Sequence, residues 1–202
     1  MTDDRPWLEY CVTEIRPPDR WLRQRSMAEL KKYLHDFAPE REAALQQQLD
    51  AWQQFYDLVS YTVSVPDDSI RALYFYASAL RFLEALGDNP FVFHVLALDD
   101  EGMRKSQEAA RSGDPKSLGA WAMRLMLRSR DREAVAALQQ AASVAPRYPL
   151  PRLLLGLLAR SQGHAEKGDQ QIRQGLQFFA SDDLRRMATS LLQEIGYRLP
   201  SS

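Results

Sequence analysis

The sequence predicts an all-α protein built from stacked antiparallel helical hairpins. Apolar residues recur at three- and four-residue steps along most of the 202 residues, which is the spacing of amphipathic helices. From residue 115 the chain repeats itself with a period of 34 residues. Residues 59–65 alternate with period two, but no second segment offers them a strand partner, so we expect an extended linker there.

The first two predicted helices lie in the N-terminal region. Ser26 and Glu29 have the spacing of a capping box, which predicts a helix from Ser26 to about Phe37. Pro39 can begin the next helix, which we expect over residues 40–58. An apolar stripe at helical spacing runs along it and just beyond, formed by Leu45, Leu49, Trp52, Phe55, Tyr56 and Val59.

A third helix is predicted from a cap at Asp67 or Asp68 to the stop signal at Gly87. Its aromatic residues, at 74–76 and at Phe82, cover most of the helix circumference. A helix that is apolar on nearly every side is typical of a buried position. We therefore expect this helix at the centre of the fold.

The segment that follows is less regular. Asn89 and Pro90 can begin a further element, and residues 91–98 fit either a short helix or a strand. Asp99 or Asp100 then caps a helix of about twelve residues that ends before Pro115.

The 34-residue repeat begins at Pro115. Small residues recur where two helices of a hairpin must approach closely, and turn-forming residues recur between them. The matched positions are Pro115 and Pro149, Ala122 and Gly156, Ser129 and Gly163, Ala134 and Gly168, Leu138 and Ile172, Ala141 and Gly175, and Pro146 and Ala180.

This helix–turn–helix unit resembles the tetratricopeptide repeat over residues 115–182. It departs from that pattern at Trp121, where leucine is usual, and at Arg152, where a bulky aromatic residue is usual. The segment AARSGDPKSLGAW is also similar to Sel1-like repeats. The resemblance implies a capping helix over 183–197. We expect degenerate hairpins in residues 1–114 that join residues 115–202 in one folded unit. The residues that carry the resemblance are Leu118, Trp121, Ala122, Leu125, Ala134, Leu138 and Pro146 in the first unit, and Leu155, Gly156, Ala159, Gly168 and Ile172 in the second.

The same resemblance implies a binding groove, because the first helix of each tetratricopeptide unit lines a concave face that binds peptides or helices. Here that face would be apolar and rich in methionine, which suits an adaptable binding site. The alternative is that this stripe is core and that N-terminal helices fold across it. Lys116 is the one candidate for a clamp on a partner's carboxylate. The expected groove residues are Met123, Met126, Leu127, Leu150, Leu153, Leu157, Leu184, Met187 and Leu191.

The sequence predicts no catalytic residue, cofactor or metal. The histidines at 35, 94 and 164 form no metal-binding spacing, and Cys11 has no second cysteine with which to form a disulfide or zinc site. We therefore expect a non-enzymatic adaptor, scaffold or chaperone-like protein that binds an apolar peptide or amphipathic helix of another protein. One alternative is an enzyme with a dispersed site. Another, less favoured, is nucleic-acid binding through Arg124, Arg128, Arg130, Arg132, Arg185 and Arg186.

Charge is unevenly distributed along the chain. Residues 1–114 carry a net charge of −7 and residues 115–202 carry +6, so the whole chain is at −1. Two such halves attract each other most readily within one chain, and we expect mainly monomer with weak, salt-sensitive self-association. With no signal peptide, no membrane-length apolar run and a lone cysteine, we expect a cytoplasmic protein. Arginine outnumbers lysine 21 to 5, a bias typical of GC-rich bacterial genomes.

Overall fold

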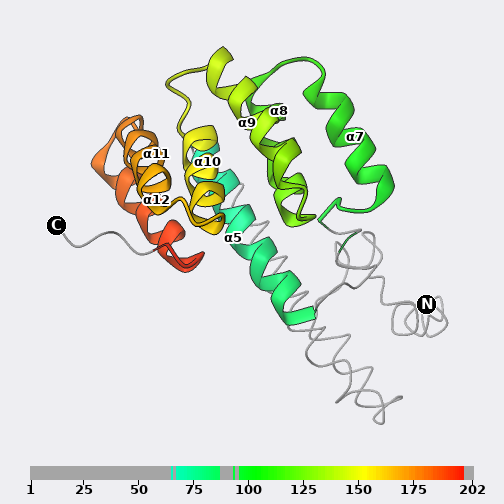
Figure 1. The fold of residues 1–202 in the computed structure, drawn as a ribbon, viewed down its shortest axis with the longest axis horizontal. Helices are drawn as coiled ribbons and strands as arrows, with labels where there is room; N and C mark the ends of the chain where they lie inside the picture. The colour runs from blue at the N-terminus through cyan, green and yellow to red at the C-terminus, as the bar shows by residue number, and fades with distance from the viewer. Residues whose placement is uncertain (1–64, 66, 87–92, 94–95, 198–202) are drawn as a thin grey trace, which may run out of the picture.

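The computed structural model describes residues 65, 67–86, 93 and 96–197, and this part of the chain is all helical (Figure 1). It contains seven α-helices and no strand, which confirms the predicted fold class for these residues. The helices expected at 26–37 and 40–58, the linker at 59–64 and the start signal at 89–90 lie outside the described residues. The helices are α5 (Asp68–Leu86), α7 (Asp100–Ala110), α8 (Pro115–Leu127), α9 (Asp131–Val144), α10 (Pro149–Ser161), α11 (Ala165–Gln177) and α12 (Asp182–Glu194).

Acidic side chains begin several of these helices. The carboxylate of Asp67 accepts hydrogen bonds from the backbone N–H groups of Ser69 and Ile70, so Asp67 is the cap of α5. Asp99 caps α7 by accepting from the N–H of Gly102. Each carboxylate satisfies N–H groups that have no partner within the helix, which fixes where the helix begins.

The 34-residue period of the sequence is also the period of the helices. α8 and α10 begin 34 residues apart, and so do α9 and α11. The turns match as well, because Ser129 and Gly163 both adopt a left-handed backbone, with φ of 54° and 85°. Residues 115–177 therefore form two helical hairpins that repeat every 34 residues, each with a left-handed residue in its turn.

Glycines let the two helices of the second hairpin approach closely. A Cβ atom on Gly156 would lie 2.7 Å from the carbonyl oxygen of Gly168, and one on Gly168 would lie 2.7 Å from the carbonyl oxygen of Gly156. Both distances are shorter than van der Waals contact. The equivalent residues of the first hairpin, Ala122 and Ala134, are fully buried. The predicted role of these small residues is thereby confirmed.

Helix α5 lies against the first helix of each hairpin and against α12 (Figure 1). Its residues Ile70, Leu73 and Ala79 are at most 1% exposed. Ion pairs tie both ends in place, Asp68 to Lys116 on α8 and Arg81 to Glu194 on α12. One side of α5 is therefore buried against the other described helices, whereas Tyr74 and Phe75 are only half-buried.

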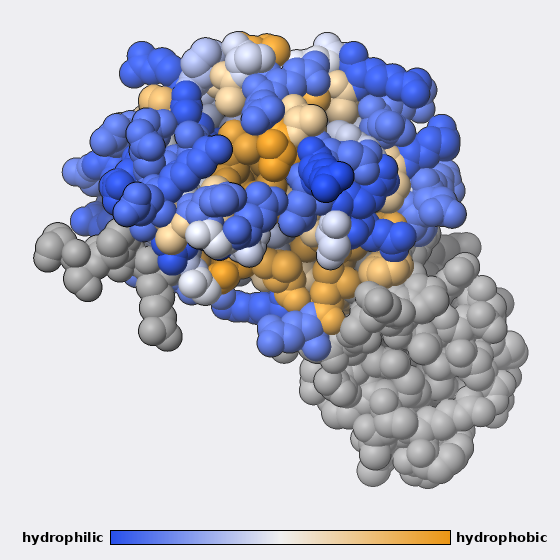
Figure 2. Space-filling view, viewed as in Figure 1, coloured by the Kyte–Doolittle hydropathy of each residue, from blue (hydrophilic) through white to orange (hydrophobic). Residues whose placement is uncertain are grey.

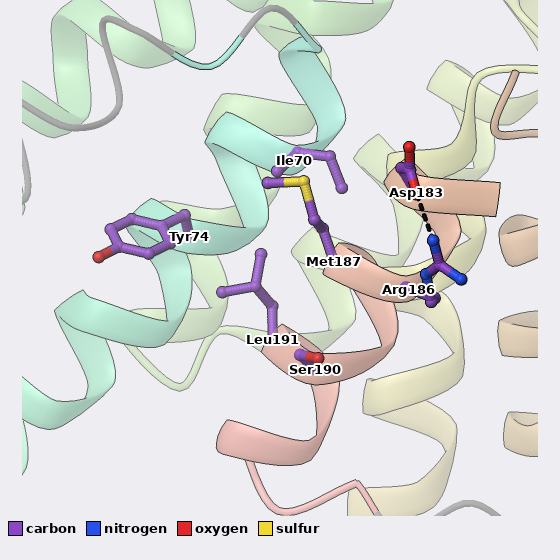
Figure 3. A pocket seen from close by; sticks show the side chains of 7 residues that line it. All are labelled: Ile70, Tyr74, Asp183, Arg186, Met187, Ser190 and Leu191. Carbon is purple, nitrogen blue, oxygen red and sulfur yellow. Dashed lines mark hydrogen bonds and ion pairs between the residues drawn. The ribbon is translucent and has the colours of Figure 1, made fainter. Parts of the chain in front are cut away.

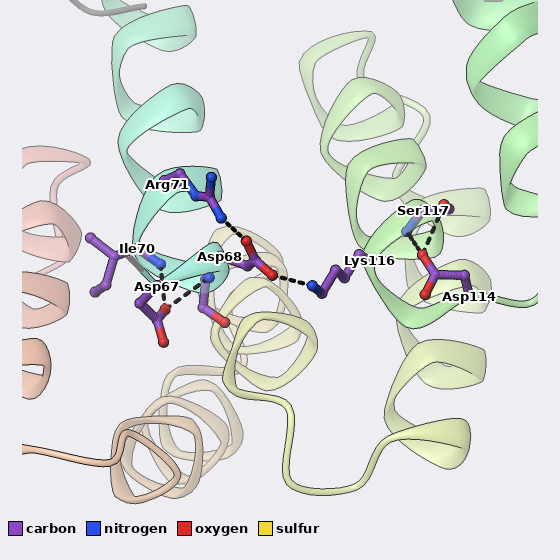
Figure 4. A network of polar contacts seen from close by, with 8 residues as sticks. Asp67, Asp68, Ile70, Arg71, Asp114, Lys116 and Ser117 are labelled. Carbon is purple, nitrogen blue, oxygen red and sulfur yellow. Dashed lines mark hydrogen bonds and ion pairs between the residues drawn. The ribbon is translucent and has the colours of Figure 1, made fainter. Parts of the chain in front are cut away.

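The pair at the start of α5 belongs to a small polar network (Figure 4). Asp68 bonds to Arg71 on its own helix and to Lys116 at the start of α8. The hydrogen bond and charge of Lys116 lower the pKa of Asp68, and Asp68 in turn raises the pKa of Lys116. Asp114 caps α8 by accepting from the N–H and the hydroxyl of Ser117, which lowers the pKa of its carboxyl group. The contact brings the first turns of α5 and α8 together.

One continuous apolar core joins all the described helices. It runs from Val65 and α5 through both hairpins to Tyr197, beyond α12. The described part of residues 1–114 therefore shares its core with residues 115–197. No helix among the described residues is long and apolar enough to span a membrane.

Candidate functional site

The structure divides the nine expected groove residues into two sets. Met123, Leu150, Leu153 and Leu191 are buried in the core, each at most 6% exposed. The other five, Met126, Leu127, Leu157, Leu184 and Met187, are half-buried and pack against that core. The nine residues therefore do not form one open groove in this part of the chain.

Two contacts explain why the buried leucines are not on an open face. A Cβ atom on Gly175 of α11 would lie 2.7 Å from Leu153, so Leu153 fills the seam inside the second hairpin. Leu150 packs beside Gly119 of α8, between the two hairpins. Helix α10 carries an apolar stripe wider than one neighbour can cover, and α8, α9, α11 and α5 each bury part of it. Helix α5 covers part of the stripe from the N-terminal side, and the neighbouring repeat helices cover the rest.

An apolar cleft remains open between α5 and α12 (Figure 3). Met187 and Leu191 project from α12 toward Ile70 and Tyr74 on α5. The cleft has a volume of about 370 Å³. Two of its residues, Met187 and Leu191, belong to the expected groove, whereas the residues from α5 were not predicted.

Polar groups lie along the α12 side of this cleft. Asp183 and Arg186 form an ion pair one turn apart, on the side away from α5, and Ser190 follows one turn later. The side chains of the pair are 80% and 77% exposed, so the pair is solvated and contributes little to stability. The cleft thus has an apolar floor and a polar rim, which is the usual anatomy of a protein-binding surface.

Apolar side chains also reach the surface on the face shown in Figure 2. They gather in the middle of that face, where Figure 1 shows α10 and α5, and charged side chains surround them. The half-buried groove residues Met126 and Leu157 line a second, smaller cavity together with residues of α5. Residues of α5 therefore line both an apolar cleft and a second cavity of mixed polarity.

Lys116, the one candidate for a carboxylate clamp, already has a carboxylate partner. That partner is Asp68 of the same chain, which binds it across the start of α5 and α8. Lys116 is therefore engaged in the fold.

Comparison with family models, curated proteins and solved structures gives no match to this chain. The site is interpreted from its own geometry.

The arginines that suggested nucleic-acid binding are mostly engaged elsewhere. Arg130 makes two hydrogen bonds of 2.7 Å to Glu133, and Arg185 and Arg186 pair with Asp182 and Asp183. Arg128 stacks over the ring of Phe93 at 4.6 Å, and Arg124 donates to the carbonyl oxygen of Ala120 on its own helix. Three of the six arginines therefore pair with a carboxylate and Arg124 is half-buried, whereas Arg128 and Arg132 are exposed.

Metal ligands do not gather within the described residues. No group of three or more His, Cys, Asp or Glu side chains there is placed to hold a metal ion. Cys11, His35 and His94 lie outside the described residues.

Sequence reasoning missed the cleft residues of α5, although a signal was present. Ile70 and Tyr74 are four residues apart, so they share a face of the predicted helix. Nothing in the sequence indicated that this face would meet α12, because 95 residues lie between the two helices. Only the packing of α5 along α12 brings the two halves of the cleft together.

Proposed function

We propose that this protein is a non-enzymatic adaptor that binds an apolar peptide or an amphipathic helix of another protein. The binding surface is the cleft between α5 and α12. The observation that carries the proposal is the apolar floor formed by Ile70, Tyr74, Met187 and Leu191 beneath a solvated polar rim.

The shape of the cleft supports a helical or extended segment as the ligand. An amphipathic helix presents large apolar side chains three or four residues apart, and one or two such side chains fit a volume of about 370 Å³. Met187 is unbranched and adaptable, so it can repack around different side chains. The resemblance of residues 115–182 to tetratricopeptide repeats supports the same class of ligand. In this protein α5 lies against the first helices of the hairpins, where such repeats bind an external helix.

The compartment proposed for this adaptor is the cytoplasm. Cys11 is the one cysteine of the chain, so no intramolecular disulfide is possible, which suits a reducing compartment.

Site-specific photo-crosslinking tests the proposed surface. A benzoylphenylalanine side chain at Ser190, which is exposed beside the cleft, should crosslink to a partner protein in native lysate. The same group at Val144, an exposed apolar residue on α9, is the control and should not. Equal crosslinking from both positions would contradict a partner site between α5 and α12.

Substitutions then test whether the cleft supplies the affinity. Met187→Asp should weaken binding of the crosslinked partner at least ~10-fold, because a carboxylate would lose its hydration in the apolar interface. Val144→Asp is the matched control and should leave binding unchanged. Ser190→Arg places a large side chain at the rim of the cleft and should block a ligand. Because Ser190 is exposed, this substitution should not disturb folding, so a loss of binding can be distinguished from a loss of folding. Unchanged affinity in both Met187→Asp and Ser190→Arg would overturn the proposal.

A further inference from the structure

A second cavity opens between the middle of α5, the last turns of α8 and α10, the start of α9 and the residue that follows α12. It has a volume of about 240 Å³ and is lined from α5, α8, α9, α10 and the residue that follows α12. One part of its wall is apolar and the other is polar. The apolar residues are Leu80, Met126, Leu157, Leu158 and Ile195, and the polar residues are Tyr76, Asp131 and Ser161.

The carboxylate of Asp131 makes no ion pair or hydrogen bond among the described residues, although several arginines lie nearby in the chain or fold. Arg130, the preceding residue, binds Glu133 through two hydrogen bonds. Arg132 is exposed, and adjacent residues of a helix do not share a face.

Two further arginines adjoin lining residues of the cavity in the chain, and both are paired. Arg81, next to Leu80, pairs with Glu194 at 2.9 Å, and Arg160, next to Ser161, pairs with Asp169. These arginines are therefore paired with carboxylates other than Asp131, which lies in the first turn of α9. No cation among the described residues pairs with Asp131, so its carboxylate is available to a cationic ligand.

The phenol of Tyr76 stays neutral beside this charge. Burial and the negative charge of Asp131 raise the pKa of Tyr76 to about 12. A neutral phenol oxygen can accept a hydrogen bond from a donor that sits on the carboxylate. The hydroxyl of Ser161 is occupied as a donor to the carbonyl oxygen of Leu158, which leaves its oxygen free to accept. Each of the three polar groups that line the cavity thus has an oxygen that can accept a hydrogen bond from a ligand.

We propose that this cavity binds a primary alkylammonium group, with the ammonium on Asp131 and Tyr76 and the alkyl chain against Met126, Leu157 and Ile195. An ammonium group has three donors and a positive charge, and its alkyl chain matches the apolar wall. At about 30 Å³ per water, the cavity has room for about eight water-sized groups. An alkylammonium ion with six carbons and one nitrogen therefore fits this volume. The ammonium group belongs either to a free small amine or to a lysine side chain of a partner. This inference does not depend on the proposed adaptor function.

Binding can be followed on the full chain labelled with ¹³C at its six methionine methyl groups. Hexylammonium chloride, added at constant ionic strength, should shift the Met126 resonance in a saturable way with a Kd of about 1 mM, whereas Met103 on α7 should not shift. Hexanol has the same chain without the charge and should bind at least ~10-fold more weakly. Equal effects of the two compounds on wild-type protein would overturn the proposal, whatever the variants show.

Two matched substitutions test the role of the carboxylate. Asp131→Asn should weaken hexylammonium binding at least ~10-fold, and Asp131→Glu should restore most of it. Asp183→Asn removes an acid from the first turn of α12 and should leave binding unchanged. Wild-type affinity in Asp131→Asn would refute the assignment. Nα-acetyl-lysine methylamide distinguishes the two sources of the ammonium group. An affinity within threefold of that for hexylammonium indicates a lysine side chain, and a much weaker affinity indicates a free amine.

Discussion

Single residues decide how closely the repeated helices pack. Gly156 and Gly168 stand where the first hairpin has Ala122 and Ala134. Glycine lowers the stability of a helix by up to ~1 kcal/mol relative to alanine, so the sequence alone suggests a weak second hairpin. The close approach of the two backbones at these residues offsets that cost through tighter packing.

Gly156→Ala should therefore destabilise the protein by about 1–2 kcal/mol. The new methyl group would meet the carbonyl oxygen of Gly168 at 2.7 Å, and the cost of overpacking exceeds the gain in helix propensity. Urea denaturation followed by circular dichroism measures the change. Gly119→Ala is the control, because its methyl group would meet only the flexible end of Leu150 at 3.0 Å and should be close to neutral. A more stable Gly156→Ala variant would contradict the close approach.

Arg152 is a second single residue that affects how the helices of a hairpin pack. It stands where the tetratricopeptide pattern has a bulky aromatic residue, and its guanidinium donates to the side-chain oxygens of Gln171 and Gln174 on α11 at 3.2 and 3.1 Å. The same group lies 5.7 Å from the ring centre of Phe178. A long cationic side chain thus links α10 to α11 through polar contacts and one aromatic ring.

Two buried tyrosines predict how stability depends on alkaline pH. Burial raises the pKa of Tyr76 and of Tyr148 to about 12 in the fold, above the value near 10 of an unfolded chain. The fold favours the neutral phenols, so their contribution is complete below pH 10 and is lost as the pH rises toward 12. Urea midpoints between pH 9 and 12 should fall across this window.

The variant Tyr76→Phe isolates the first of these groups. It cannot ionise at this position, so its urea midpoint should fall less steeply between pH 10 and 12 than that of the wild type. Ultraviolet absorbance at alkaline pH should show one late-titrating tyrosine fewer. Identical pH dependence in the two proteins would show that Tyr76 ionises as an exposed phenol.

At the scale of elements, α5 organises the described part of the fold. It contacts α8, α10 and α12 and supplies one wall of both cavities. Two hairpins of a repeat bury too little apolar surface to be stable alone, because each unit covers its face only against a neighbour. α5 provides that neighbour for both hairpins and for α12.

Leu73→Ala on α5 should cost about 2–5 kcal/mol of unfolding free energy. Leu73 is fully buried, and its removal leaves a cavity among helices of both hairpins. Urea unfolding should shift as a single transition, because α5 and residues 115–197 share one core. Val144→Ala is the control and should change stability by less than ~0.5 kcal/mol, since Val144 is 57% exposed. A separate transition for α5 would show that it folds independently of the hairpins.

At the scale of the whole molecule, we predict that the protein is mainly a monomer. The acidic N-terminal region and the basic C-terminal region meet within one chain at the Asp68–Lys116 pair. An intramolecular contact forms without loss of translational freedom, so it prevails over the same contact between chains.

Light scattering across a salt series tests this expectation. The mass should stay near 23.2 kDa at 0.5 M salt, with weak association at most at low salt, because the Debye length is only about 10 Å at 0.1 M. A stable dimer at both low and high salt would refute the expectation. Such a dimer would also indicate that the apolar cleft between α5 and α12 binds a second copy.

The sequence by itself determined the helical fold, the starts of α5, α7, α8 and α10, and the 34-residue register of the hairpins. These features depend on local chemistry: a capping carboxylate, a left-handed turn at Ser129 and Gly163, and small residues at a fixed spacing. Each of them acts between residues close together in the chain. Periodicity and spacing therefore suffice to locate them.

Only the tertiary structure decided which apolar faces are covered. Leu153 and Met187 both lie on stripes at helical spacing, yet the first fills the seam of a hairpin and the second lines an open cleft. Whether a described arginine pairs with Asp131 likewise depends on which acids the neighbouring arginines reach in space. Burial and ion pairing are properties of the distances between distant segments, and a hydrophobic pattern is the same whether another helix covers it or leaves it open.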